Sequence, residues 1–237
     1  MLFLIVVYAF TDDSGHLTLA NFQKFFEHPE AINTFVYSIG IAIITTLVCI
    51  LLGYPAAWIL SNSKLNRSKT MVVLFILPMW VNILVRTLAT VALFDFFSVP
   101  LGEGALIFGM VYNFIPFMIY PIYNTLQKMD HSYIEAAQDL GASTTQTLFR
   151  VLIPMSVPGI STGITMVFVP SVSTFAISRM LGGGSNLLIG DLIEMQFLGN
   201  SYNLNVGSAM SLVLMIIVLL CMSFTSSFDE DEMEGVS

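Results

Sequence analysis

The residues from 128 to 159 form a polar stretch between two long apolar runs, and they carry the side chains whose spacing could do chemistry. Glu135 and Asp139 lie four residues apart, so on a helix their carboxylates share one face and could pair with basic groups of a partner. Ala136 and Ala137 leave the same helix smooth enough for another backbone to approach closely. The chemistry that this pattern predicts is recognition of another protein rather than covalent catalysis.

Local signals predict a short helix and a glycine corner in this stretch. Ser132 precedes Glu135 by three residues, which is the spacing of a capping box, and so predicts a helix over residues 133–140. Gly141 suits the left-handed turn that ends such a helix. We therefore expect the chain to turn at Gly141.

A second short helix is expected after the corner. Thr144 or Thr145 could open it, and it would run through Phe149. Pro154 would then stop or redirect the chain before it enters the bilayer. The alternative interpretation of the whole stretch is an amphipathic loop that only connects two spans.

The composition places these elements on a membrane protein. Of the 237 residues, 56% are apolar and only 10% are charged, too few charges for a soluble core of this size. Cys49 and Cys221 lie inside apolar runs, so they predict neither a disulfide framework nor a metal site. The net charge of −8 reflects five acids in residues 229–237, an acidic tail expected to be cytoplasmic, and nucleic-acid binding is not supported.

Apolar runs predict an all-α, multi-pass membrane fold in a single domain over residues 1–237. Residues 1–10 are too short to span a bilayer of about 30 Å and indicate a truncated first helix; a cleaved signal peptide is the less favoured alternative. Pro78 predicts a kink in the second complete span. Five complete spans are expected, over residues 31–60, 71–97, 105–126, 151–178 and 206–228. Residues 11–30 and 179–205 are expected to be loops outside the membrane.

The basic residues predict the orientation of the chain. Five of them flank the same ends of the spans, and by the positive-inside rule they mark the cytoplasmic side: Lys64, Arg67, Lys69, Lys128 and Arg150. Lys24 and Arg179 would then lie outside. This orientation places residues 128–159 in the cytoplasm.

The spacing within that loop resembles the coupling-loop signature of the permease subunits of binding-protein-dependent ABC importers. The pattern is Glu-Ala-Ala, three residues, Gly, nine residues, and then an aliphatic, one residue, an aliphatic and Pro. The resemblance implies the type I permease fold and a loop that sits in a groove of a cytoplasmic ATP-binding subunit. The residues that it implicates are Glu135, Ala136, Ala137, Gly141, Val151, Ile153 and Pro154.

The resemblance also implies how the chain works with partners. It implies a second permease subunit, an extracytoplasmic substrate-binding protein, ATP held on the partner and location in a bacterial cell membrane. The chain itself has no Gly-x4-Gly-Lys-Ser/Thr loop, so we expect no ATPase activity, no cofactor and no bound metal. A passive structural subunit and a membrane-embedded enzyme are the alternatives from other classes, and the spans supply few groups for an enzyme.

Three segments, residues 53–58, 77–87 and 181–197, look most like the first permease subunit of spermidine/putrescine importers. Permeases for sulfate or other small solutes share the architecture, and an anion permease is the alternative. Asp95 lies among three phenylalanines, a combination that recognises alkylammonium groups, although an interfacial carboxylate in water is equally consistent. The candidates for the substrate path are Asp95, Trp80, Tyr112 and Tyr120.

Other charged residues near the spans are interpreted as structural. Arg86 would repel a cation in a path, so a packing or headgroup-anchoring role is expected. Asp191 and Glu194 could guide cations or contact a delivering protein, but a solvated helix face is the default expectation.

Overall fold

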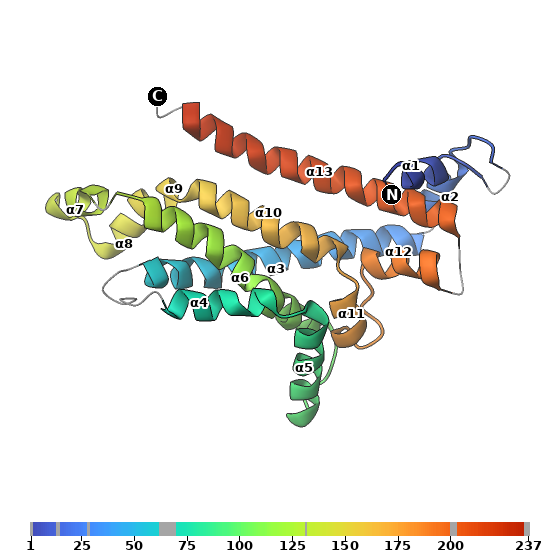
Figure 1. Ribbon diagram of the computed structural model, residues 1–237, viewed down its shortest axis with the longest axis horizontal. Helices are drawn as coiled ribbons and strands as arrows, with labels where there is room; N and C mark the ends of the chain where they lie inside the picture. The colour runs from blue at the N-terminus through green and yellow to red at the C-terminus, as the bar shows by residue number, and fades with distance from the viewer. Residues whose placement is uncertain are drawn as a thin grey trace. The chain divides into compact units, whose positions relative to one another are not determined.

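A computed structural model describes residues 2–12, 15–27, 29–61, 70–130, 132–199 and 203–234 (Figure 1). The described residues are mostly helical, with one isolated bridge between Thr11 and Leu17, and the all-α class is confirmed. The side chains of the acidic tail and the basic residues between 62 and 69 lie outside the described part. The helices are α1 (Leu2–Ala9), α2 (Ala20–Glu27), α3 (Pro29–Ser61), α4 (Thr70–Ile76), η1 (Leu77–Trp80), α5 (Ile83–Phe96), α6 (Glu103–Lys128), α7 (Ser132–Asp139), α8 (Thr144–Thr147), η2 (Leu148–Leu152), α9 (Ile153–Met155), α10 (Val157–Ser173), α11 (Ala176–Leu181), α12 (Ile189–Leu198) and α13 (Leu204–Glu234).

Three of the described helices are long and apolar enough to span a membrane unbroken: α3, α6 and α13. Two further spans exist if each of two bent helix pairs crosses as one unit, and these are α4 with η1 and α5, and α8 to α9 with α10. The described residues therefore hold three to five spans, and the expected number of five is reached only if both bent pairs cross as single spans.

The first bend follows the predicted proline. Pro78 lies in the 3₁₀ turn η1, and the helices on either side of the break meet at 98°. Asn82 restarts the helix because its side-chain oxygen accepts the N–H of Leu84 at 2.8 Å. The expected kink is in fact a complete break in the hydrogen-bond ladder.

The second bend corrects the prediction for Pro154. The helix that opens at Thr144 continues to Met155, and the bend of 68° comes at Ser156. Pro154 lies one residue before the end of this helical segment, and Ser156 leaves helical geometry with φ −100° and ψ 5°. Its hydroxyl donates to the carbonyl of Ile153 at 3.0 Å.

The chain divides into two compact units, each built from separate segments. The first holds residues 1–45, 82–112 and 168–221, and the second holds residues 46–81, 113–167 and 222–237.

In the first unit, the loop expected over residues 11–30 is partly folded. Residues 20–27 form α2, and Phe25 is buried in a cluster with Ala31, Val172 and Met210. Asn21 is buried as well, and its amide donates to the carbonyls of Ala9 and Thr11 at 3.1 and 2.9 Å. The expectation of a fully solvated loop is wrong because α2 is amphipathic and buries its apolar face.

In the second unit, small residues let helices pack at close range. A Cβ on Gly159 of α10 would lie 2.5 Å from Thr125 Oγ1 and 3.0 Å from the carbonyl oxygen of Pro121, both on α6. Tyr54 of α3 and Ser156 share a buried hydrogen bond of 3.0 Å. This unit therefore holds α3, α6 and α10 together close to the polar loop.

Candidate functional site

The predicted glycine corner ends α7. Gly141 has a φ of +81°, the left-handed conformation that was expected. The N–H of Ala142 donates to the carbonyl of Ala137 at 3.0 Å, and the N–H of Gly141 donates to that of Gln138 at 2.9 Å. These two bonds form a Schellman motif, which satisfies carbonyls that the helix end would leave open.

The next helix, α8, begins at Thr144, three residues after Gly141. Ser143 Oγ accepts the N–H of Gln146 at 3.3 Å, and Gln146 Oε1 accepts the N–H of Ser143 at 2.9 Å. This reciprocal pair is a capping box. The corner between α7 and α8 is thus fixed by hydrogen bonds on both sides.

The capping box predicted at Ser132 does not form as expected. Ser132 is the first residue of α7, and its N–H donates to the side chain of Asp130 at 2.9 Å. Asp130 reaches this N–H because its short carboxylate side chain bonds readily to the backbone two residues on. The helix therefore begins and ends one residue earlier than expected.

The residues of the coupling-loop signature lie on this helical corner and on the segment that follows it. Glu135, Ala136 and Gly141 are exposed, whereas Ala137 is half-buried. Leu140, beside the corner, is 90% exposed, which is unusual for a leucine at the end of a helix. The corner thus presents a carboxylate, a small side chain and a large apolar side chain to the outside of the chain.

The last three signature residues lie behind the corner. Val151 is on η2, which has π-helical hydrogen bonding and packs against α7. Ile153 and Pro154 follow on α9 and are half-buried and exposed, respectively. These three residues therefore lie on, or directly after, the helical segment η2 against which α7 packs.

The four candidates for a substrate path are divided between the two units. Asp95 and Tyr112 belong to the first unit, and Trp80 and Tyr120 belong to the second. All four side chains are exposed, and Trp80 is 88% exposed. Asp95 neighbours an edge-to-face pair of Phe96 and Phe97 with centroids 5.2 Å apart. Their role in a path stays a prediction.

Arg86 is buried within the first unit. It is 7% exposed, and its guanidinium carbon lies 5.8 Å from the centroid of the Tyr112 ring. This distance is within the range of a cation–π contact. The geometry agrees with the packing role that was expected of this arginine.

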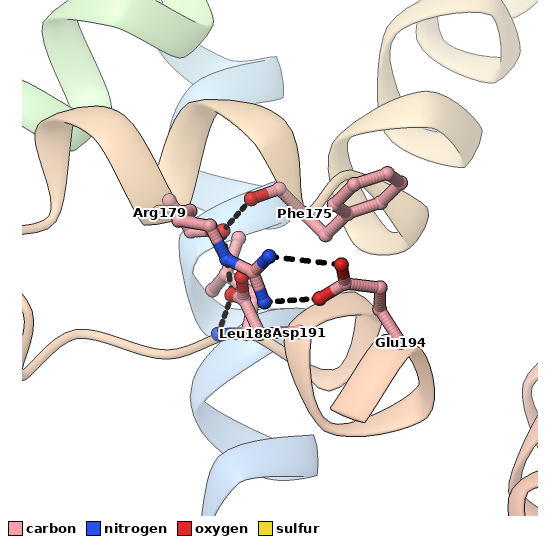
Figure 2. Close-up of polar contacts among 6 residues, drawn as sticks. Phe175, Arg179, Leu188, Asp191 and Glu194 are labelled. Atoms are coloured by element: carbon pink, nitrogen blue, oxygen red, sulfur yellow. Dashed lines mark hydrogen bonds and ion pairs between the residues drawn. The ribbon is translucent and has the colours of Figure 1, made fainter. Parts of the chain in front are cut away.

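A polar cluster after α10 contradicts the expectation of a solvated face. Arg179 of α11 forms a two-pronged ion pair with Glu194 of α12, with Nη1 2.8 Å from Oε1 and Nη2 on Oε2 (Figure 2). Asp191 lies on the same helix as Glu194 but is completely buried. The two acids therefore have different surroundings, and neither simply faces water.

Hydrogen bonds hold Asp191 at the start of α12. Its Oδ2 accepts the hydroxyl of Ser178 at 2.6 Å and the N–H of Leu188 at 2.8 Å. The next N–H, that of Ile189, donates to Ser38 of α3 at 2.7 Å. The beginning of α12 is therefore capped from within the helix and from α3.

Burial raises the pKa of Asp191 above its ordinary value of 3.8, although both hydrogen bonds to the carboxylate act to lower it. Its other oxygen, Oδ1, is buried and has no hydrogen-bond partner among the described residues. The charge of Arg179 also favours the ionised form, but more weakly than burial opposes it. Sequence spacing alone missed this cluster, since its members come from α3, α11 and α12.

Comparison with known proteins defines the class of this chain. Residues 49–229 match the family described as the binding-protein-dependent transport system inner membrane component. The chain belongs to this family. It is therefore an inner-membrane permease subunit of an ABC importer, and its apolar helices agree with a multi-pass membrane protein.

Relatives within the family include named permeases. The chain is 36% identical over 218 residues to the spermidine/putrescine transport system permease protein PotB of Escherichia coli, with 85% of this chain and 78% of PotB covered. It is 34% identical to the PotB protein of Haemophilus influenzae, with 86% and 77% covered. The inner membrane ABC transporter permease protein YdcU of Escherichia coli is 25% identical, with 88% and 75% covered.

Solved structures share the fold. A chain of the inward-facing MetNI methionine ABC transporter aligns with a TM-score of 0.66 at 20% identity, covering 83% of this chain and 93% of that one. A bacterial ABC transporter involved in the import of alginate aligns with a TM-score of 0.76 at 13% identity, covering 97% and 88%. The type I permease fold expected from the coupling-loop signature is thus confirmed.

Proposed function

We propose that this chain is a permease subunit of a polyamine importer, driven by ATP hydrolysis on a separate cytoplasmic subunit. The substrate class rests on the 36% identity to the spermidine/putrescine permease over most of both chains. In the proposed cycle, a binding protein delivers the substrate outside, and a second permease subunit completes the path. Closure of the ATP-binding subunits then drives alternating access.

The observation that carries the coupling role is the geometry of the α7–α8 corner. A segment that couples the movements of two subunits needs a fixed shape and an exposed contact surface. The Schellman motif and the capping box fix the shape of the α7–α8 corner. The contact surface is formed by three exposed residues, Glu135, Ala136 and Leu140. Packing of α7 on η2 gives movement of the corner a direct route into the helix that leads to α10.

Glu135 is the residue that we expect to pair with a basic group of the ATP-binding subunit. Losing one partner of a buried, hydrogen-bonded ion pair costs about 2–5 kcal/mol, which corresponds to a reduction in binding affinity of more than tenfold. In the Glu135→Arg variant, uptake of radiolabelled spermidine by proteoliposomes containing the complete importer and ATP should fall by about tenfold or more. The amount of the subunit in the membrane should stay the same.

The matched control is Glu30→Arg, which reverses an exposed acid in the first turn of α3. Its uptake should stay within about twofold of wild type, because an exposed charge contributes little. Wild-type uptake by the Glu135→Arg importer would refute the coupling role. Uptake of sulfate in place of spermidine by the wild-type importer would refute the polyamine assignment.

A further inference from the structure

A hollow of about 280 Å³ lies in the first unit between α10, α12 and α13. Its wall combines apolar side chains with hydroxyls and one carboxylate. The lining residues are Ser173, Phe175, Gly190, Ile193, Glu194, Ser211 and Leu214. They come from α10, the turn after it, α12 and α13, and part of this wall lies in the stretch 179–205 that the basic residues predict to face outward.

Apart from Arg179, the charged side chains at this hollow are acidic. Glu194 lines the hollow, and its carboxylate is held by Arg179, whose side chain is 49% exposed against 19% for Glu194 (Figure 2). Asp191 adds a second carboxylate behind the pair, close enough to favour the charge of Arg179. Among the described residues, Arg179 pairs with Glu194 alone, and it is the more exposed member of that pair.

The end of α10 also borders the hollow, opposite the first turn of α12. Ser173 is the last residue of this helix, where the carbonyl groups carry the negative end of the helix dipole. The carbonyl oxygens of Ser173 and Thr174 face Gly190 of α12, within 2.7 and 2.6 Å of where a Cβ would be. An ammonium group in the hollow would therefore meet a carboxylate and hydroxyl oxygens, whereas the carbonyls at the end of α10 are turned toward the first turn of α12.

The other walls suit the alkyl part of the same ligand. Ile193 and Leu214 are apolar, and Phe175 contributes an aromatic side chain, which attracts cations through its ring face. Ser173 and Ser211 place hydroxyl oxygens at the wall, each already donating its hydrogen to a carbonyl of its own helix, at 3.0 and 2.8 Å. Their lone pairs are therefore oriented to accept from an incoming N–H donor.

We propose that this hollow is a subsite for a primary ammonium group of the transported polyamine, which replaces Arg179 as the counter-cation of Glu194. The identity of the cation rests on the proposed function. Exchange is possible because the guanidinium is the more exposed member of the pair, at 49% against 19% for Glu194, so once freed it can be solvated where it is. An ammonium group is smaller than a guanidinium, so it can enter the hollow while Arg179 stays at its rim.

Replacement of Arg179 by an ammonium group at Glu194 predicts changes in binding that a purely structural ion pair would not produce. Removing the carboxylate with Glu194→Gln should weaken binding of radiolabelled putrescine by about tenfold or more, since a hydrogen bond to a charged group is lost. Removing the competing cation with Arg179→Gln should strengthen binding by about two- to fivefold. A structural ion pair would give a decrease, or no change, for both variants.

The measurement is equilibrium binding of putrescine to the complete importer, without its binding protein, in nanodiscs of phosphatidylcholine and phosphatidylglycerol. These lipids carry no primary ammonium group. The matched control, Glu30→Gln, removes one exposed acid from the same unit outside the cluster and should bind putrescine like wild type. Opposite shifts for the two cluster variants support the subsite. Equal binding, or a decrease in both, overturns it.

Two further measurements distinguish the subsite from the transport function and from a lipid site. If wild-type proteoliposomes do not import spermidine or putrescine while the two variants shift putrescine binding in opposite directions, the proposed function fails and the ammonium subsite stands. If putrescine binding is the same in all variants but phosphatidylethanolamine co-purifies with wild type and not with Glu194→Gln, the ammonium comes from a lipid headgroup. That result overturns the assignment to substrate.

Discussion

Gly141→Ala is the substitution that tests the coupling corner with the least disturbance elsewhere. Gly141 has a φ of +81°, and a Cβ added there would meet no atom within 4 Å. The methyl group therefore creates no clash and removes no contact. Its whole effect comes from the backbone, since an alanine in the left-handed region costs about 1–2 kcal/mol.

That cost is large on the scale of a conformational equilibrium. About 1–2 kcal/mol changes the ratio of two states by a factor of about 5–30. If the corner must keep the Schellman geometry to hold the ATP-binding subunit, the population of competent corners falls by this factor. We therefore expect spermidine uptake, and the stimulation of ATP hydrolysis by loaded binding protein, to fall by about fivefold or more.

Gly15→Ala is the matched control for backbone strain. Gly15 has a φ of +80°, and a Cβ added there would also meet no atom within 4 Å, but this glycine lies in the turn between α1 and α2. The variant carries the same local cost and should lower thermal stability to a similar extent. Its uptake for each molecule of folded importer should remain that of wild type.

The two variants together separate a specific effect at the corner from general strain. Both are assayed in the complete importer in proteoliposomes, with uptake and ATP hydrolysis measured on the same preparation. Normal coupling in Gly141→Ala would refute the requirement for a left-handed corner. An equal loss in Gly15→Ala would show that general strain, rather than the corner, reduces transport.

Three further substitutions test packing and electrostatics. Gly159→Ala should destabilise the importer by about 1–3 kcal/mol, because its Cβ would lie 2.5 Å from Thr125 Oγ1. The loss should appear as a lower apparent Tm of the purified importer. Gly53→Ala, which meets only a flexible methionine side chain at 3.0 Å, should cost less, and equal Tm values would contradict this ranking. Because the pKa of Asp191 is raised in the folded state, folding binds a proton, so stability should fall as the pH rises from the ordinary value of 3.8 through the raised pKa. Asp191→Asn should abolish this dependence in thermal unfolding measured across that range, and an unchanged slope would assign it to another group.

Local signals predicted the α7–α8 corner well and its boundaries less well. The left-handed turn at Gly141 followed from residue type, because few other residues adopt that conformation at low cost. Ser132 was predicted to cap α7 with its own side chain. In the structure, the carboxylate of Asp130 accepts the N–H of Ser132, and Ser132 is already part of the helix. The prediction considered only Ser132 as the cap and did not consider Asp130.

Prolines predicted that the spans bend but not where each bend falls. At Pro78 the helix breaks, because a 3₁₀ turn and the cap at Asn82 follow immediately. At Pro154 it continues, and the bend comes at Ser156, whose hydroxyl is shared with Tyr54 of α3. The second bend therefore coincides with a hydrogen bond between residues 102 positions apart, which no local signal specifies.

Short-range signals were enough to establish an all-α membrane protein with a glycine corner, since apolar run length, helix caps and the conformational freedom of glycine act over a few residues. The surroundings of the charged groups after α10 depend instead on long-range packing. Asp191 and Glu194 share a helix, yet one is completely buried and the other is paired with Arg179 on α11. Packing of α12 against α3 and α11 sets this difference, because burial and ion pairing depend on neighbours that no local spacing specifies.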